Sequence, residues 1–135
     1  MELMKYLIDT NICIYIMNKR PVSVIEKFKT MTPGDIGISS ITVSELQYGV
    51  AKSSRKVENS RRLNEFLLPF DILPYDSSAA AAYGDIRYQL ENAGQTIGPL
   101  DMLIGAHALS QNLIVITNNI KEFSRIANLV AENWA

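Results

Sequence analysis

Leu113-Ile114-Val115-Ile116-Thr117 is the clearest strand signal in the chain, because an uninterrupted apolar run rich in β-branched residues ends at a polar threonine. Working outward from it, residues 5–8 (Lys5-Tyr6-Leu7-Ile8) form a second short apolar run, which ends at Asp9. Ile36-Gly37-Ile38-Ser39 predicts another strand. Runs of this kind are typical of strands buried on both faces of a sheet.

Helical patterns separate the predicted strands. We expect a further strand at 71–73, a final extended segment near 129–130, and helices at 10–17, 23–29, 43–51, 77–92, from 99 onward and around 121–123. Residues 52–59 are expected either to form a loop or to begin a helix that continues through 61–62 to 68. Parallel neighbours need crossover connections, so this alternation predicts an α/β fold with a mostly parallel sheet covered on both faces. The length of 135 residues leaves room for one core, so residues 1–135 are expected to form one domain.

Composition sets broad limits on function. Hydrophobic residues make up 47% and charged residues 20%, as in ordinary globular proteins, and the net charge of -1 does not indicate a nucleic-acid binder. A polyanionic ligand would need local patches, metal ions or a basic partner. The single cysteine excludes an intrachain disulfide, and neither a signal peptide nor a membrane-spanning run is evident, so a cytoplasmic protein is expected.

Polar side chains gather where the predicted strands end. In an open α/β sheet, ligands bind at the carboxyl ends of the strands. Asp9 follows the first strand, Glu45 follows the second, Thr117 and Asn119 follow the run at 113–116, and Asp101 begins a helix after Gly98-Pro99. Clustered carboxylates without histidine favour Mg²⁺ or Mn²⁺.

Each acid also has a purely structural interpretation. Asp9 is suited to cap the helix that follows it. Thr42 and Glu45 have the spacing of a capping box, and Asp101 is favoured in a first helical turn by the helix dipole. One shared metal site is the more economical explanation of all three.

Four segments together resemble the PIN-domain ribonucleases. They are Lys5-Tyr6-Leu7-Ile8-Asp9-Thr10-Asn11; Ile38-Ser39-Ser40-Ile41-Thr42-Val43-Ser44-Glu45-Leu46 with Gly49; Ile97-Gly98-Pro99-Leu100-Asp101-Met102-Leu103-Ile104-Gly105-Ala106-His107-Ala108; and Val115-Ile116-Thr117-Asn118-Asn119 with Glu122-Phe123. Their order spans nearly the whole chain. Within that family the sequence is most similar to VapC toxins of bacterial VapBC toxin–antitoxin pairs.

The resemblance implies a PIN-like three-layer α/β/α fold and the toxin of a type II toxin–antitoxin system. It also implies a Mg²⁺- or Mn²⁺-dependent endoribonuclease that cuts structured RNA such as tRNA, with initiator tRNA as a guess. A VapB-type antitoxin and a homodimer are the implied partners. By position, Asp9, Glu45 and Asp101 match the metal-binding acids and Thr117 matches the threonine that lines the site. Asn119 stands where many members have a fourth acid. Glu122, one helical turn further on, is expected either to take the place of that acid or to point away.

Other residues have weaker signals. Lys52, Arg55, Lys56, Arg61 and Arg62 form the densest basic cluster, which predicts either phosphate contacts or a solvated face. His107 shares a helical stripe with Leu100, Leu103 and Ile104, which predicts a core residue or one that supports the site from behind. Asn11 is expected either to bond Asp9 or simply to begin a helix.

Two other functions remain open at this point. A PIN-like module could have lost catalysis through Asn119 and serve only to bind RNA or an antitoxin. An aspartyl-nucleophile phosphatase would begin with a strand ending in Asp-x-Asp, but Asn11 occupies the place of the second aspartate. A dinucleotide-binding fold would need a glycine-rich first turn, which is absent.

Overall fold

A computed structural model describes residues 4–135. Its sheet has five parallel strands in the order β3-β2-β1-β4-β5, and therefore confirms the α/β prediction. The strands are β1 (Tyr6–Ile8), β2 (Ile36–Ser39), β3 (Asp71–Leu73), β4 (Ile114–Ile116) and β5 (Ala131–Glu132). Residues 1–3, and with them part of the N-terminal segment considered as a signal peptide, lie outside the described residues.

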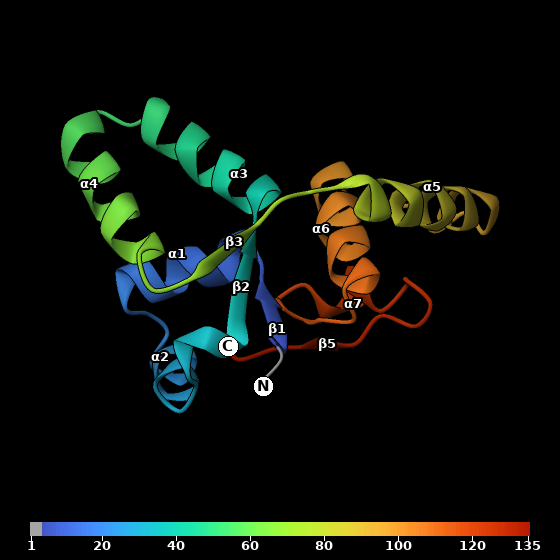
Figure 1. The fold of residues 1–135 in the computed structure, drawn as a ribbon, viewed down its shortest axis with the longest axis horizontal. Coiled ribbons are helices and arrows are strands. Elements are labelled where there is room, and N and C mark those ends of the chain that lie inside the picture. Colours follow the sequence, from blue (N-terminus) through green and yellow to red (C-terminus); the bar gives the residue numbers. More distant parts are fainter. Residues whose placement is uncertain (1–3) are drawn as a thin grey trace.

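The helices form two layers around the sheet (Figure 1). They are α1 (Thr10–Asn18), α2 (Val22–Lys29), α3 (Ser40–Ala51), α4 (Lys56–Leu67), α5 (Ser77–Asn92), α6 (Pro99–Ser110) and α7 (Ile120–Phe123), with a 3₁₀ turn, η1, at Pro33–Asp35. Residues of α1 to α4 pack on one face, and residues of α5 to α7 pack on the other. No helix in residues 4–135 combines the length and apolarity needed to cross a membrane.

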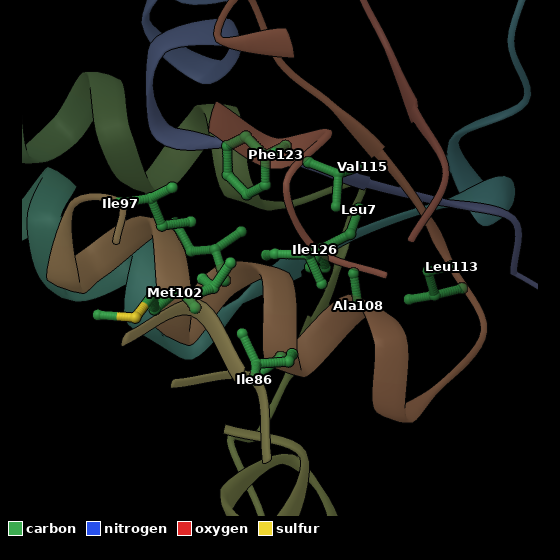
Figure 2. Packing of buried hydrophobic residues seen from close by; sticks show 12 residues of the cluster. Leu7, Ile86, Ile97, Met102, Ala108, Leu113, Val115, Phe123 and Ile126 are labelled. Carbon is green, nitrogen blue, oxygen red and sulfur yellow. The ribbon is translucent and has the colours of Figure 1, made fainter. Parts of the chain in front are cut away.

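Successive side chains along each short strand contribute to the hydrophobic layers on opposite faces of the sheet. Leu7 and Val115 pack with Ile86, Met102, Phe123 and Ile126 on the side of α5 to α7, as Figure 2 shows. Ile8 and Ile116, one residue further along each strand, pack on the opposite face. The apolar runs are continuous because successive side chains point to opposite faces, and both faces are buried.

The order of the strands determines where a ligand can bind. β1 lies between β2 and β4, so the chain first adds strands on one side of β1 and then returns to add β4 and β5 on the other. With right-handed crossovers, this reversal places α5 to α7 on the opposite face from α1 to α4. The carboxyl ends of β1 and β4 therefore flank the position where ligands bind in open α/β sheets.

Two local predictions were wrong. The last strand is β5 at Ala131–Glu132 rather than near 129–130, because Val115 donates to the carbonyl of Val130 and Thr117 donates to that of Glu132. The helix expected from 43 begins at Ser40, capped by the hydroxyl of Ser39. The helix predicted at 77–92 has those bounds, Ser77–Asn92, and is capped by Asp76, whose side chain accepts from the amide of Ala79.

Candidate active site

Asp9 lies at the junction of β1, β4 and α1. Its amide donates to the carbonyl of Ile116 (3.0 Å), and its Oδ1 accepts from the amide of Ile12 (3.0 Å) as the N-cap of α1. The side chain is 4% exposed. A hydrogen bond from the buried Thr117 reaches the same carboxyl group. Asp9 thus caps α1, as its structural interpretation predicted. The capping hydrogen bond also holds the carboxylate at the carboxyl edge of the sheet, so the capping role is compatible with a site at that edge.

Glu45 reaches the same end of the sheet from α3. Its Oε1 accepts a 2.7 Å hydrogen bond from the hydroxyl of Thr10, the residue after Asp9. The capping-box interpretation is wrong, because α3 begins at Ser40 and Thr42 is already inside the helix. Thr42 is fully buried and its hydroxyl has no hydrogen-bond partner in residues 4–135. Glu45 is therefore held by α1 and not by its own helix start.

A third group of site residues consists of Asp101, Asn119 and Glu122. Nδ2 of Asn119 donates to Oδ2 of Asp101 (3.2 Å) and to Oε2 of Glu122 (2.9 Å). The amide of Asn119 donates to Oγ1 of Thr117 (2.9 Å), which fixes the loop after β4. Of the two alternatives expected for Glu122, pointing away was wrong. α7 begins at Ile120, so its first turn brings Glu122 back over Asn119.

Burial and nearby carboxyl groups raise the pKa values of two site acids, Asp9 and Asp101. Burial raises the pKa of Asp9, against the hydrogen bonds from Thr117 and Ile12, and the nearby Glu45 charge raises it further. The pKa of Asp101 is raised to about 6, first by burial and then by Glu122. The hydrogen bond from Asn119 lowers the pKa of Glu122. Of the Asp101–Glu122 pair, Asp101 is therefore the carboxyl group that takes up a proton first as the pH falls.

The donor set fits a hard divalent cation. The ion pairs among residues 4–135 are Arg55–Glu58 and Arg87–Glu91, so no basic side chain pairs with Asp9, Glu45 or Asp101. Buried carboxylates without a counter-charge are costly, and oxygen ligands suit Mg²⁺ or Mn²⁺. No group of three or more acidic, histidine or cysteine side chains in residues 4–135 is already arranged as a metal-binding cluster. Asn119 occupies the space between two of the acids.

The predicted basic cluster is spread along the α3–α4 hairpin. Arg62 lines a groove of about 270 Å³ together with Glu45, Ile14 and Leu46. Its Nη2 makes long contacts with the carbonyl of Met17 (3.5 Å) and Oδ1 of Asn18 (3.4 Å). The other members are exposed: Lys52 lies over the ring of Tyr48, Arg55 pairs with Glu58, and Lys56 and Arg61 lie on α4. Only Arg62 borders the groove that also contains a candidate catalytic acid.

Asn11 does not bond Asp9. Its Nδ2 lies 3.4 Å from Oδ1 of Asn118, whose own Nδ2 donates to the hydroxyl of Tyr15 (2.8 Å). Neither Thr10 nor Asn118 was predicted as a site residue. Their only signal was position, because each follows a predicted site residue at the end of a strand.

Comparison with known proteins agrees with this geometry. The PIN domain family model matches residues 6–129. "Ribonuclease VapC2" of Rickettsia felis is 45% identical, covering 97% of this chain and 98% of that protein. The "tRNA(fMet)-specific endonuclease VapC" of Shigella flexneri is 41% identical, covering 98% and 100%.

Solved structures show the same relationship. The crystal structure of DNA-bound VapBC from Salmonella typhimurium contains a chain that superposes with a TM-score of 0.92 at 38% identity, covering 98% of this chain and 100% of that one. The observed sheet, the order of the four sequence segments and the match to the family model therefore all indicate the same fold. This protein belongs to the PIN-domain family, in its VapC ribonuclease branch.

Proposed function

We propose that residues 1–135 form a single catalytic unit, the toxin of a type II toxin–antitoxin system, which cuts RNA with the help of Mg²⁺ or Mn²⁺. The observation that carries this proposal is the set of uncompensated carboxyl groups, Asp9, Glu45 and Asp101, at the carboxyl ends of the strands. The similarity to VapC ribonucleases supports the same chemistry.

In this proposal Asp9, Glu45, Asp101 and Glu122 hold the cation, which when bound activates water and stabilises charge on the phosphate. Asn119 supplies an amide in place of a fourth family acid, and Glu122 supplies the negative charge from one helical turn further on. Thr117 orients Asp9, and Asn119 orients Asp101. Hydrolysis would leave a 5′-phosphate and a 3′-hydroxyl.

The proposed substrate is a structured RNA, with tRNA favoured by the printed name of the Shigella flexneri relative. Lys52, Arg55, Lys56, Arg61 and Arg62 would contact phosphates along the α3–α4 hairpin, since sequence-independent affinity for nucleic acid comes largely from such contacts. The VapBC complexes among the similar structures support a VapB-type antitoxin as a partner, and the homodimer follows from the family resemblance. A cytoplasmic location follows from a tRNA substrate.

The first experiment is cleavage of a total tRNA pool by purified protein with Mg²⁺ or Mn²⁺, comparing the wild type with Asp9→Asn and with an EDTA control. A few discrete products from the wild type alone would establish a site-specific metallonuclease. Equal cleavage by both proteins would mean contamination or a wrong site. No cleavage by a folded wild type would favour a module that binds RNA or an antitoxin without cutting.

A further inference from the structure

His107 is a buried ionisable side chain that the proposed chemistry leaves unused. It is fully buried on α6, which confirms its expected place in the core. The expected stripe is only partly right, because Leu100 is 45% exposed. Gln111 lies 3.5 Å from Nε2, and the ring of Tyr75 meets the imidazole edge-on at 5.6 Å. The imidazole is thus a polar group buried among packed side chains, where a polar group requires hydrogen-bond partners.

The short contact of His107 is with Ser39. Nδ1 lies 2.8 Å from Oγ of Ser39, the last residue of β2 and the N-cap of α3. That oxygen already accepts from the amide of Ile41 (3.1 Å), so its single proton is free to be donated to Nδ1. Burial lowers the pKa of His107, with Asp76 and the carbonyl of Pro74 opposing, which fits a neutral ring that accepts at Nδ1.

This contact joins the two helices that carry two of the acids. Glu45 lies six residues after Ser39, and Asp101 lies six residues before His107. At a rise of 1.5 Å per residue, each acid is about 9 Å along its helix from the contact. α3 and α6 pack against each other. Within residues 4–135, no other side-chain hydrogen bond connects α6 with β2 or α3.

We propose that His107 is a positioning residue: through its hydrogen bond to Ser39 it fixes α6 against the start of α3, and so sets the separation of Asp101 and Glu45. The proposal rests on the proposed function, because the separation matters only if both acids hold one cation. A hydrogen bond is better suited to this task than apolar contact alone, because it is directional and specifies one register of the two helices.

The test compares His107→Asn with His107→Leu. Asparagine places a polar atom near the position of Nδ1 and retains the bond, whereas leucine fills the space without it. The main readout is Mn²⁺ affinity by isothermal titration calorimetry, with the melting temperature and the kcat and KM of RNA cleavage alongside. Loss of a partner that orients metal ligands typically costs 10–100-fold in metal affinity. Since His107 acts through two helices, we expect about a tenfold loss for leucine and less than about threefold for asparagine.

Two further variants separate positioning from packing. Ile104→Val is a mild core change on the same helix and should lower the melting temperature without changing Mn²⁺ affinity. Ser39→Ala removes the same bond from the other side, which keeps the test valid if His107→Leu does not fold. The Mn²⁺ affinity of Ser39→Ala should fall as in His107→Leu. Combining Ser39→Ala with His107→Leu should lower the Mn²⁺ affinity little further, because both changes remove the same bond.

The outcomes are distinguishable. If the asparagine and leucine variants bind Mn²⁺ as the wild type does, the positioning role is wrong and the proposed function stands. The same holds if Ile104→Val also loses Mn²⁺ affinity, so that affinity falls in all three variants in proportion to melting temperature. If the wild type itself binds no Mn²⁺ and cuts no RNA, the proposed function fails and the positioning role fails with it.

Discussion

The hydroxyl of Thr10 donates a 2.7 Å hydrogen bond to Oε1 of Glu45, so the residue after one candidate metal ligand orients another. Asp9 caps α1, and Thr10 begins that helix. The start of α1 therefore presents one carboxylate directly and holds the second through a hydroxyl. Glu45 comes from α3, thirty-five residues away, and this hydrogen bond limits its side-chain freedom before any cation arrives.

Replacing Thr10 with valine should weaken metal binding. Valine keeps the branched shape but removes the donor, so Glu45 must be ordered at the time of binding, and we expect about a tenfold loss in Mn²⁺ affinity. Thr10→Ser should stay near the wild type. Thr30→Val is the matched control, because that hydroxyl bonds only the carbonyl of Lys27 in α2. Equal affinities for Thr10→Val and Thr10→Ser would show that the hydrogen bond does not prepare Glu45.

Asp101→Asn should stabilise the metal-free protein at neutral pH. The folded pKa of about 6 exceeds the unfolded value of about 3.9, so the folded state binds the proton more tightly. The contribution of Asp101 to metal-free stability is therefore greatest at low pH and falls as the pH rises through the interval between these values. Replacing Asp101 with asparagine removes this loss of stability at higher pH. Because Asp101 is only half buried, screening reduces the expected gain to about 1 kcal/mol at pH 7.5.

Urea denaturation in EDTA at pH 7.5 and pH 4.5 measures this effect. The gain from Asp101→Asn should shrink at the lower pH, where the wild-type carboxyl group is largely protonated. Asp85→Asn, an exposed change on α5, is the control and should alter stability little at either pH. A destabilised Asp101→Asn at pH 7.5 would contradict the repulsion among the site acids.

The central sheet and the main acids were predictable because their signals are local. Apolar runs at the centre of an all-parallel sheet are continuous, so β1, β2 and β4 were found close to their true bounds. Asp9 and Glu45 could be placed together because parallel strands present their carboxyl ends at the same edge. The position of Asp101 followed from proline at the first turn of α6.

Glu122 could not be placed from the sequence because its direction depends on where a four-residue helix begins. A shift of one residue in the start of α7 would rotate its side chain by about 100° around the helix axis. The capping-box error has a similar origin, since Ser39 and Thr42 are both good caps and only tertiary packing selects between them. The Ser39–His107 contact spans 68 positions, and no local pattern indicates it.

Asn119→Asp should make the stability of the protein depend on metal. The Asn119 amide now donates to both Asp101 and Glu122, and an aspartate would replace two hydrogen bonds with repulsion among three carboxylates. We expect a loss of about 1–3 kcal/mol in EDTA, with a larger recovery on adding Mg²⁺ than in the wild type. Thermal melting with and without Mg²⁺ measures both effects.

Asn118→Asp is the matched control for this change. Asn118 is exposed and bonds Tyr15 and Asn11 rather than a carboxylate, so its replacement should have a smaller effect in EDTA and no added Mg²⁺ response. Similar behaviour of the two variants would mean that Asn119 does not separate the site acids.

Arg62→Gln should weaken RNA binding more than loss of a basic residue elsewhere. Arg62 borders the groove that contains Glu45, and its long contacts with Met17 and Asn18 leave the guanidinium available for a phosphate. Losing one phosphate contact lowers the slope of log K against log salt by about 0.9 for a duplex. Binding of tRNA in EDTA, measured by fluorescence anisotropy over a salt series, gives both affinity and slope.

The control for this change is Lys29→Gln, which removes the same charge at the end of α2, outside the α3–α4 hairpin. If Lys29→Gln changes the slope equally, attraction is set by overall charge; if only Arg62→Gln changes it, the RNA backbone passes beside Glu45, where cleavage is proposed to occur.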